Sequence, residues 1–503
     1  MKFARVASIT AIAFITFLAV PLYLAAQAPS RLPTFHGKNG RTVFNKLNLV
    51  CAMNDDWSKV QQLSSGVVGD GALCSLEGRE GHTAPTVPPH YKFVDLGTLG
   101  GPQSSMQDLA VVLNNRGIVV GLADTSDADP NYPNFNPLLG QDPFIQFATA
   151  WQNGKAHNLG TLPGGSSSFA AWITDNGWIG GIAENGSIDP FTGWPATDAV
   201  IWKNGQIQDL GNLSGGNEAG VTAINSAGAA VGFAANGTLD QYSFGGWGTQ
   251  SRAFRWTPQT QTMQDLGTLG GPDAVPWLTN ETGQVAGQSN LNAIPNQITT
   301  MCGAKVPTVD AFLWENGKMN DLPGLGGICS GAAGLNNSGV VVGFSYANAV
   351  SFHPVLWQKD EQGDYTVKDL GSFGRPGGTA NWINDAGEVV GWVFTQTGFS
   401  RAFLWKNDQL MDLGLLQGDA CNGAFSINSK TQIVGNSGDC KGDSHPFLWE
   451  NESMYDLSTS FPPNYFTSEE VSFINDAGEI AGTGKLPNGD RHAYVLLPSA
   501  TGH

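Results

Sequence analysis

Three short elements recur along this chain from about residue 91 to the C-terminus, and their repetition limits the folds that the chain can adopt. The first ends in Asp-Leu-Gly, as at residues 95–97. The second is Ile/Leu-Asn-x-x-Gly followed by an apolar pair and Gly, as in residues 383–391, and the third is Ala-Phe-Leu-Trp, as in residues 311–314. Each element has eight copies, some of them degenerate, and successive Trp positions are 43 to 58 residues apart. Fixed elements at such a period are typical of propellers and solenoids.

The repeated elements predict strands that are joined by tight turns. Asn-Gly pairs at residues 153–154, 204–205 and 316–317 join the Trp-ended run to the next apolar run. Asn-Gly is the strongest short hairpin signal, because both residues tolerate positive φ. The Asn-x-x-Gly element predicts a second hairpin. Each repeat therefore predicts four antiparallel strands: a ends in Asp-Leu-Gly, b ends at the Asn turn, c carries Val-Val-Gly and d ends in Trp.

The two ends of the repeat region complement each other. The first copy, at residues 92–101, lacks its d strand, and the last copy ends after residues 492–496 without an a strand. Pairing these ends completes one more sheet and closes a ring, which removes two exposed sheet edges. The sequence predicts an all-β propeller of four-stranded antiparallel blades, eight in number, with seven as the alternative if one irregular copy is an insertion.

The N-terminal residues predict export. Lys2 and Arg5 precede an apolar run at residues 6–24, and small residues follow at Ala25, Ala26 and Ala28. This is the pattern of a signal peptide, here residues 1–26. An uncleaved membrane anchor over residues 6–26 is the alternative. We expect a secreted, periplasmic or cell-surface protein with a non-repeat spacer or small cap at residues 27–90, the propeller at 91–498 and a short tail at 499–503.

Charge and cysteine usage fit such a protein. With 25 Lys and Arg against 43 Asp and Glu, the net charge is −18, which opposes binding to nucleic acid or to an anionic membrane. The number of cysteines is even, as is usual for disulfides in an oxidising compartment. Sequential pairing is the simplest of the connectivities, and it gives Cys51–Cys74, Cys302–Cys329 and Cys421–Cys440. No spacing indicates a zinc site.

Loop lengths divide the predicted ring into two faces. The b–c and d–a turns share the tight-turn face, whereas the a–b and c–d connections share the long-loop face. All the large length variation is in c–d, as at residues 122–147 and 233–250. Insertions on one face of a repeat protein often mark its binding face, although drift in tolerant loops would give the same pattern.

Candidate ligand-binding residues lie in these long loops. Aromatic side chains there suit sugar or peptide binding, with loop packing as the alternative, and the candidates are Trp194, Trp247, Tyr132 and Tyr242. Asp124, Asp127 and Asp129 have a carboxylate density that suits Ca²⁺, but the EF-hand spacing is missing. We expect no other cofactor. The repeated Gly-Gly stretch at residues 97–101 predicts a turn, because a phosphate loop would need a following helix.

The repeat resembles the HAF repeats of bacterial proteins classed as extracellular. The resemblance rests on four features together: the Trp-ended strand, the Asn-Gly turn, Asp-Leu-Gly-Thr-Leu-Gly-Gly and Ile-Asn-x-x-Gly-x-Val-Val-Gly. The His-Ala-Phe triplet of that family is degenerate here, for example His492-Ala493-Tyr494 and His445-Pro446-Phe447. The resemblance covers roughly residues 91–498. It implies an exported bacterial protein, and it supplies no catalytic residues.

These observations predict an exported, non-enzymatic repeat protein that binds a carbohydrate or an extracellular protein through the long-loop face. A propeller hydrolase or lyase acting on polysaccharide, with acidic loop residues as acid and base, is one alternative. A structural envelope or matrix protein is another. The sequence does not indicate an oligomeric state.

Overall fold

The computed structural model describes residues 89–499, apart from residues 141, 305 and 443, and three strands nearer the N-terminus. Those strands, β1 (Arg41–Lys46), β2 (Leu49–Asn54) and β3 (Val60–Ser65), form an antiparallel sheet of their own in the region predicted as a spacer or small cap. The predicted signal peptide and Cys74, and with it the Cys51–Cys74 pairing, lie outside the described residues. No helix in the described part of the chain is long and apolar enough to cross a bilayer.

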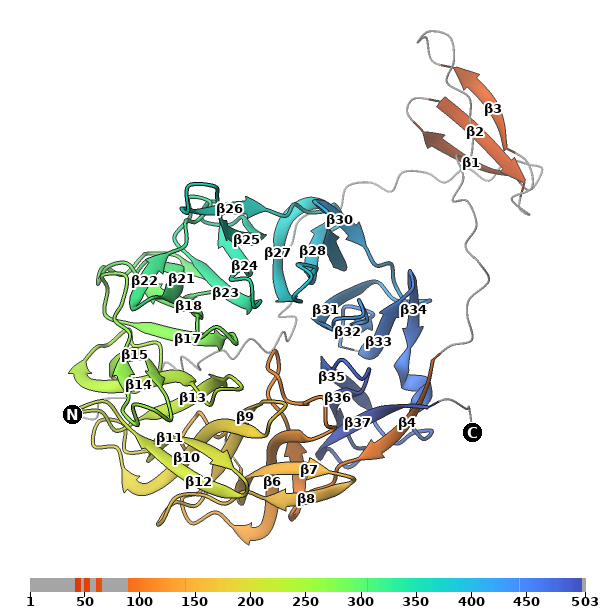
Figure 1. Ribbon diagram of the computed structural model, residues 1–503. Helices are drawn as coiled ribbons and strands as arrows, with labels where there is room; N and C mark the ends of the chain where they lie inside the picture. Colours follow the sequence, from red (N-terminus) through yellow and green to blue (C-terminus); the bar gives the residue numbers. More distant parts are fainter. Residues whose placement is uncertain are drawn as a thin grey trace, which may run out of the picture. The chain divides into compact units, whose positions relative to one another are not determined.

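Eight four-stranded antiparallel sheets form a ring in the order of the sequence, which confirms the predicted eight-bladed propeller (Figure 1). In each blade the b strand is innermost and the a strand outermost. Blades 1 to 4, from b to a, are β5 (Gly100–Ser105), β6 (Val119–Ala128), β7 (Phe144–Gln152), β8 (Lys155–Asn158); β9 (Ser168–Ile173), β10 (Trp178–Ile188), β11 (Pro195–Lys203), β12 (Gln206–Gly211); β13 (Ala219–Ile224), β14 (Ala230–Leu239), β15 (Thr249–Trp256), β16 (Gln264–Asp265); β17 (Ala274–Thr279), β18 (Val285–Asn290), β21 (Val309–Glu315), β22 (Lys318–Asp321).

Blades 5 to 8 follow the same order. They are β23 (Ser330–Leu335), β24 (Val341–Tyr346), β25 (Phe352–Lys359), β26 (Tyr365–Asp369); β27 (Gly374–Ile383), β28 (Val389–Thr395), β29 (Ser400–Lys406), β30 (Gln409–Asp412); β31 (Cys421–Ile427), β32 (Ile433–Gly438), β33 (Ser444–Glu450), β34 (Ser453–Asp456); β35 (Ser468–Ile474), β36 (Ile480–Lys485), β37 (Arg491–Ser499), β4 (His90–Asp95). The small hairpin of β19 (Thr299–Thr300) and β20 (Gly303–Ala304) lies in the c–d connection of blade 4, and the only described helix is η1 (Leu457–Ser460).

The ring closes as the ends of the repeat region predict. Strand β4, the first strand of the repeat region, pairs with β37, the last, so that Asp95 lies opposite Tyr494 and His90 opposite Ser499. Figure 1 shows β4 beside β37, where the two ends of the repeat region meet. The closure leaves neither end of the repeat as an unpaired sheet edge.

Local backbone requirements explain the repeated residues. Asn316 and Gly317 both have positive φ, 51° and 79°, as a two-residue hairpin turn needs. The Gly that ends Val-Val-Gly is required by a close approach of the b strand. At Gly343 an added Cβ would lie 2.0 Å from the carbonyl oxygen of Gly331. The Asp of Asp-Leu-Gly caps its own turn, since Gly97 N donates to Asp95 Oδ1 at 2.8 Å.

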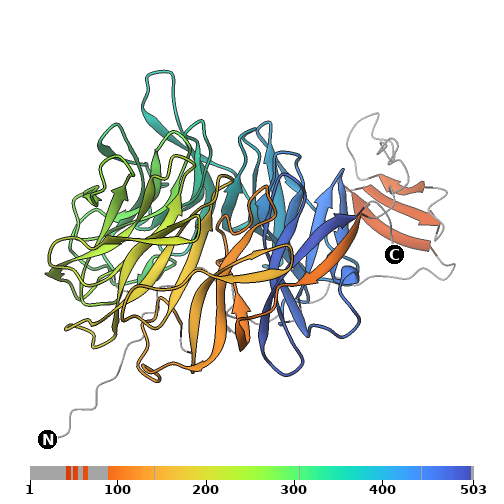
Figure 2. The ribbon, with the colours of Figure 1, turned by 60° about the horizontal axis from the view of Figure 1, so that its bottom comes forward.

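The Trp that ends strand d lies in the protein core. Trp151, Trp202 and Trp357 are fully buried. Apolar clusters run between neighbouring blades, and one of them is continuous across several blades. The two faces are as predicted, with the tight turns on one and the a–b and c–d connections on the other. Figure 2 shows the ring obliquely, tilted from the view of Figure 1.

Candidate functional site

An axial cavity of about 320 Å³ opens on the tight-turn face. The inner strands and the Asn turns of all eight blades line it, so every repeat contributes to one site. Sequence reasoning directed attention to the opposite face and missed this cavity, because the residues that form it belong to the repeats themselves.

A ring of asparagine side chains ties the blades together around this cavity. In seven blades the Asn of the Asn-x-x-Gly turn is buried and donates its Nδ2 to the backbone carbonyl of the equivalent residue in the next blade, for example from Asn280 to Asn336 at 3.0 Å. The donors are Asn114, Asn225, Asn280, Asn336, Asn384, Asn428 and Asn475. Thr174 holds the eighth position. These bonds fix the width of the cavity mouth.

The residue after each of these positions forms the rim of the mouth, and its charge alternates around the ring. Asp175, Glu281, Asp385 and Asp476 come from alternate blades. Uncharged residues stand between them: Asn115, Ser226, Asn337 and Ser429. The lining residues include four carboxylates and no Lys, Arg or His.

Backbone N–H groups of the preceding blades hold the rim carboxylates in place. Asn337 donates its N–H to Asp385 at 2.9 Å, and its Nδ2 donates to the other carboxylate oxygen at 2.8 Å. Asn115 makes the same pair of bonds to Asp175, at 2.8 and 2.9 Å. The carboxylates are therefore positioned before any ligand arrives.

Three aromatic side chains close the axis below the rim. Trp172 of blade 2 and Trp382 of blade 6 stack with their ring centroids 6.4 Å apart. Phe473 of blade 8 packs edge-on against Trp382 at 5.6 Å. The cavity is thus a funnel with an acidic rim and an aromatic floor.

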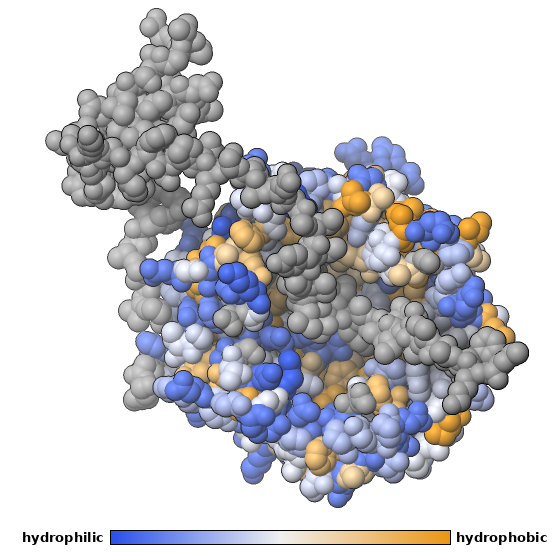
Figure 3. All heavy atoms as spheres, turned by 180° about the vertical axis from the view of Figure 1, so that it is seen from behind, coloured by the Kyte–Doolittle hydropathy of each residue, from blue (hydrophilic) through white to orange (hydrophobic). Residues whose placement is uncertain are grey.

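The long-loop face carries most of the exposed large apolar side chains of the described chain. Met411 in β30 is the one exposed large apolar side chain of the described residues that lies elsewhere. Each of the others lies in a c–d connection or at the end of the strand that leads into one. They are Tyr132, Ile188, Phe191, Leu239, Ile294, Ile298, Val350 and Phe399. On the face turned to the viewer in Figure 3, hydrophilic residues predominate and hydrophobic residues form small, separate patches.

The four aromatic residues predicted as a ligand platform do not form one. Trp247 is only 2% exposed, because it packs against Phe233 at 5.5 Å inside an apolar cluster. Trp194 and Tyr242 are half-buried, and Tyr132 is 48% exposed. None of the ring contacts in the described chain joins two of these four residues.

The three aspartates predicted as a calcium site also do not converge. Asp124 is buried in blade 1, where it accepts hydrogen bonds from Gln146 Nε2 and Gln103 N, both at 3.0 Å. Burial raises its pKa to about 6. Asp127 is exposed, and Asp129 accepts from Asn131 N at 2.8 Å. In the described chain no three His, Cys, Asp or Glu side chains are grouped to hold a metal ion.

Buried carboxylates on the long-loop face hold loops in place. Glu218, 1% exposed, accepts hydrogen bonds through Oε2 from Thr197 Oγ1 at 2.6 Å and from Asn136 Nδ2 at 2.9 Å. Asn136 belongs to the c–d connection of blade 1, so this contact pins that loop across blades 2 and 3. Burial raises the pKa of Glu218 to about 8, and its other oxygen has no partner among the described residues.

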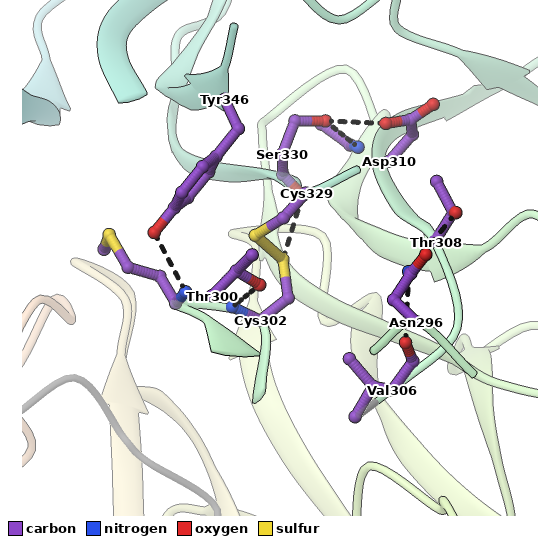
Figure 4. Close-up of a disulfide and its surroundings, with 11 residues drawn as sticks. Asn296, Thr300, Cys302, Val306, Thr308, Asp310, Cys329, Ser330 and Tyr346 are labelled. Atoms are coloured by element: carbon purple, nitrogen blue, oxygen red, sulfur yellow. Dashed lines mark hydrogen bonds between the residues drawn. A yellow bond between two sulfur atoms is a disulfide. The ribbon is translucent and has the colours of Figure 1, made fainter. Parts of the chain in front are cut away.

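Two of the predicted disulfides are present. Cys302 bonds to Cys329 and Cys421 bonds to Cys440, with Cα–Cα distances of 5.9 and 5.7 Å. Figure 4 shows the first between Tyr346, whose hydroxyl accepts from Met301 N at 3.2 Å, and the Ser330–Asp310 hydrogen bond of 3.2 Å. The first bridge joins a c–d connection to an a–b connection, and the second joins a c–d connection to the first residue of β31, so both stiffen the long-loop face.

No known family model matches the chain, and no curated protein is similar to it in sequence. Solved structures of similar architecture include a Mycobacterium tuberculosis puromycin-hydrolyzing peptidase, at 12% identity and a TM-score of 0.39 over 65% of this chain and 50% of that chain. The β-propeller domain of the Trilobed protease from Pyrococcus furiosus matches at 9% identity and a TM-score of 0.39, over 63% of this chain and 91% of that chain. The Aleuria aurantia lectin matches at 13% identity and a TM-score of 0.27, over 55% of this chain and 94% of that chain. The chain spans half the length of the first peptidase, and these weak matches carry no argument about its ligand.

Proposed function

We propose that this chain is an exported, non-enzymatic binding protein that holds an extracellular protein through its long-loop face. The observation that carries this proposal is the row of exposed apolar side chains on the c–d connections of six consecutive blades, such as Ile188, Leu239, Ile294 and Val350. Exposed apolar side chains that recur on one face give a protein partner apolar area to bury on binding. The two disulfides and the buried carboxylates hold that face in shape before binding, which reduces the entropy that binding has to overcome.

A protein ligand suits this surface better than a carbohydrate, because most of the exposed side chains are aliphatic and sugar rings stack on aromatic ones. One local feature favours a carbohydrate as the second candidate. Tyr132 and Phe191, 48% and 50% exposed, lie on neighbouring loops that are joined by a hydrogen bond of 2.8 Å from Asn134 to Gly193.

A polysaccharide hydrolase or lyase has less support. Its acid and base would have to be carboxylates that reach an open cleft on the long-loop face. Glu218 and Asp124 are buried there in hydrogen bonds that hold loops, and the axial cavity opens on the other face. A purely structural envelope protein remains the outcome if no ligand is found.

Export and the HAF assignment are part of the same proposal. Disulfides on the long-loop face are consistent with an oxidising compartment. The contacts of strand d offer a physical reason for the His of the family triplet. His492 lies 3.0 Å from Asp95 and His353 lies 2.9 Å from Asp369, so that the His contacts the Asp of the adjacent Asp-Leu-Gly strand. Arg252 plays the same part toward Asp265 at 3.0 Å.

A triple variant of the loop tips tests the proposal. Proteins retained by the immobilised chain from its native culture medium or cell surface would be identified, purified and measured by surface plasmon resonance. We expect Ile188→Ser, Leu239→Ser and Ile294→Ser together to weaken that binding at least tenfold, while Met411→Ser, the matched control on an outer strand, leaves it unchanged. Unchanged affinity in the triple variant would refute the proposal. Binding on a glycan array that is lost in Tyr132→Ala would establish the carbohydrate candidate instead.

A further inference from the structure

We propose that the axial funnel is a second binding site and that it takes an ammonium or guanidinium group on a flexible chain, such as the Lys or Arg side chain of an extended peptide. The site lies on the face opposite to the proposed protein-binding surface and does not depend on that surface. Three features carry the inference: the charge of the rim, the chemistry of the floor and the size of the cavity.

The rim selects for positive charge. Its four carboxylates come from alternate blades, and no basic side chain lines the cavity. A mouth lined by one sign of charge concentrates ions of the opposite sign, and the net charge of −18 acts in the same direction. An ionised carboxylate offers about four acceptor positions. Asp385 uses two of them within the rim, and among the described residues Ser429 N alone donates to Asp476, at 2.9 Å, so acceptor capacity remains for a ligand.

The floor provides both an aromatic surface and unused donors. Trp172 is 7% exposed and Trp382 is half-buried, and neither indole N–H makes a hydrogen bond to another described residue. Both residues line the cavity, so these donors are available to an oxygen that a ligand brings to this depth. The faces of Trp and Phe rings also attract organic cations. A peptide carries both groups, a cationic side chain and a backbone carbonyl.

The size of the funnel limits what can enter. A volume of about 320 Å³ is at the lower end of the range for ligand cavities, roughly 300–1,000 Å³. It admits one side chain or a small amine and excludes a folded domain or a branched glycan. A neutral sugar could use the indoles, but it would leave four negative charges without a counter-charge.

Matched charged and neutral probes test the proposal by calorimetry on the full chain. One pair is acetyl-Gly-Arg-Gly-amide and its citrulline counterpart, which have nearly the same shape and differ in charge. The other pair is butylguanidinium and butylurea. We expect the arginine peptide to bind at least tenfold more tightly than the citrulline peptide, with an affinity that falls as salt is added. Butylguanidinium binding as tightly as the peptide would support the site and identify a small free organic cation as a sufficient ligand. Equal affinity within each pair, or no binding of either cation, would overturn the proposal.

Variants locate the binding in the funnel. Asp175→Asn with Asp385→Asn is compatible with the ring, because Asn115 and Asn337 occupy the equivalent positions in other blades. We expect this pair of changes to weaken arginine-peptide binding about threefold to tenfold, and Trp382→Leu to weaken it by a similar factor through loss of the aromatic surface. Asp127→Asn, an exposed change on the other face, is the control. Unaltered affinity in the double Asp variant, with an unaltered melting temperature, would place the binding elsewhere and refute the site.

Discussion

Glu218 offers a direct test of how the long-loop face is held together. Its carboxylate is 1% exposed and accepts hydrogen bonds from Thr197 and Asn136, and burial raises its pKa from 4.5 to about 8. The folded chain therefore holds a proton on Glu218 that the unfolded chain releases. Since the folded-state pKa is the higher one, the stabilising contribution of this proton is fully present below pH 4.5. It is lost as the pH rises toward 8.

The magnitude follows from the size of the shift. One pKa unit corresponds to about 1.36 kcal/mol, so the full shift is worth about 5 kcal/mol, and most of it falls between pH 5 and pH 8.5. Glu218→Gln keeps the shape and the acceptor of the protonated side chain but does not titrate. We expect the stability of the variant relative to the native protein to rise by about 4 kcal/mol between pH 5 and pH 8.5.

Urea unfolding of both proteins at the two pH values measures this difference, and the other titrating groups cancel because the two proteins share them. Glu361→Gln, an exposed change in the Asp360–Asp364 turn, is the matched control and should show no such trend. A stability difference between native protein and Glu218→Gln that is the same at both pH values would refute the argument that burial holds this proton.

Three further predictions concern the ring and its ties. The hydrogen bond to Asp95 raises the pKa of His492; the pKa of Asp95 is lowered, because its bonds to His492, Tyr465 and Gly97 outweigh the effect of burial. The pair should therefore stabilise ring closure between about pH 4 and 6.5. We expect His492→Ala to lower the free energy of unfolding in urea by about 1 kcal/mol at pH 5.5 and by less at pH 9. An equal loss at both pH values would contradict the pairing. Replacing Cys421 and Cys440 by Ser opens a bridge over 19 residues and should lower the free energy of unfolding by about 3 kcal/mol, with no loss meaning that the bridge contributes nothing. Asn336→Ala removes the bonds to Val340 N at 3.0 Å and to Asn384 O at 3.3 Å and should cost about 2 kcal/mol, whereas the exposed change Gln362→Ala should cost close to none.

Turn chemistry explains why so much of the fold could be predicted from local sequence. Asn316-Gly317 and Gly343 each meet a backbone requirement that few other residues satisfy, so their recurrence identified hairpins and blades. The missing strands at the two ends of the repeat identified the closure of β4 on β37. Cysteine order, read with the loop layout, predicted Cys302–Cys329 and Cys421–Cys440.

The candidate sites were harder to predict, because exposure is not a local property. Trp247 lies in a long loop, where an aromatic side chain suggests a platform, but Phe233 and its neighbours bury it. Asp124 and Asp127 are close in sequence, yet strand alternation and the bonds of Asp124 to Gln146 and Gln103 turn Asp124 into the blade. The alternating residues after each turn Asn, such as Asp385 and Asn337, can be read from the sequence. Their assembly into one rim cannot.

The sequence by itself determined the repeating unit and the division into two faces, because each depends on turns within one repeat. It also predicted the closure of the ring from the two incomplete ends, and it favoured eight blades over seven. Only the tertiary structure decided where a ligand can enter. Trp172 and Trp382 come from opposite sides of the ring, and their contact at the axis depends on the curvature that eight stacked blades impose. Repeats fix a protein's architecture through local contacts, whereas its cavities depend on how distant copies meet.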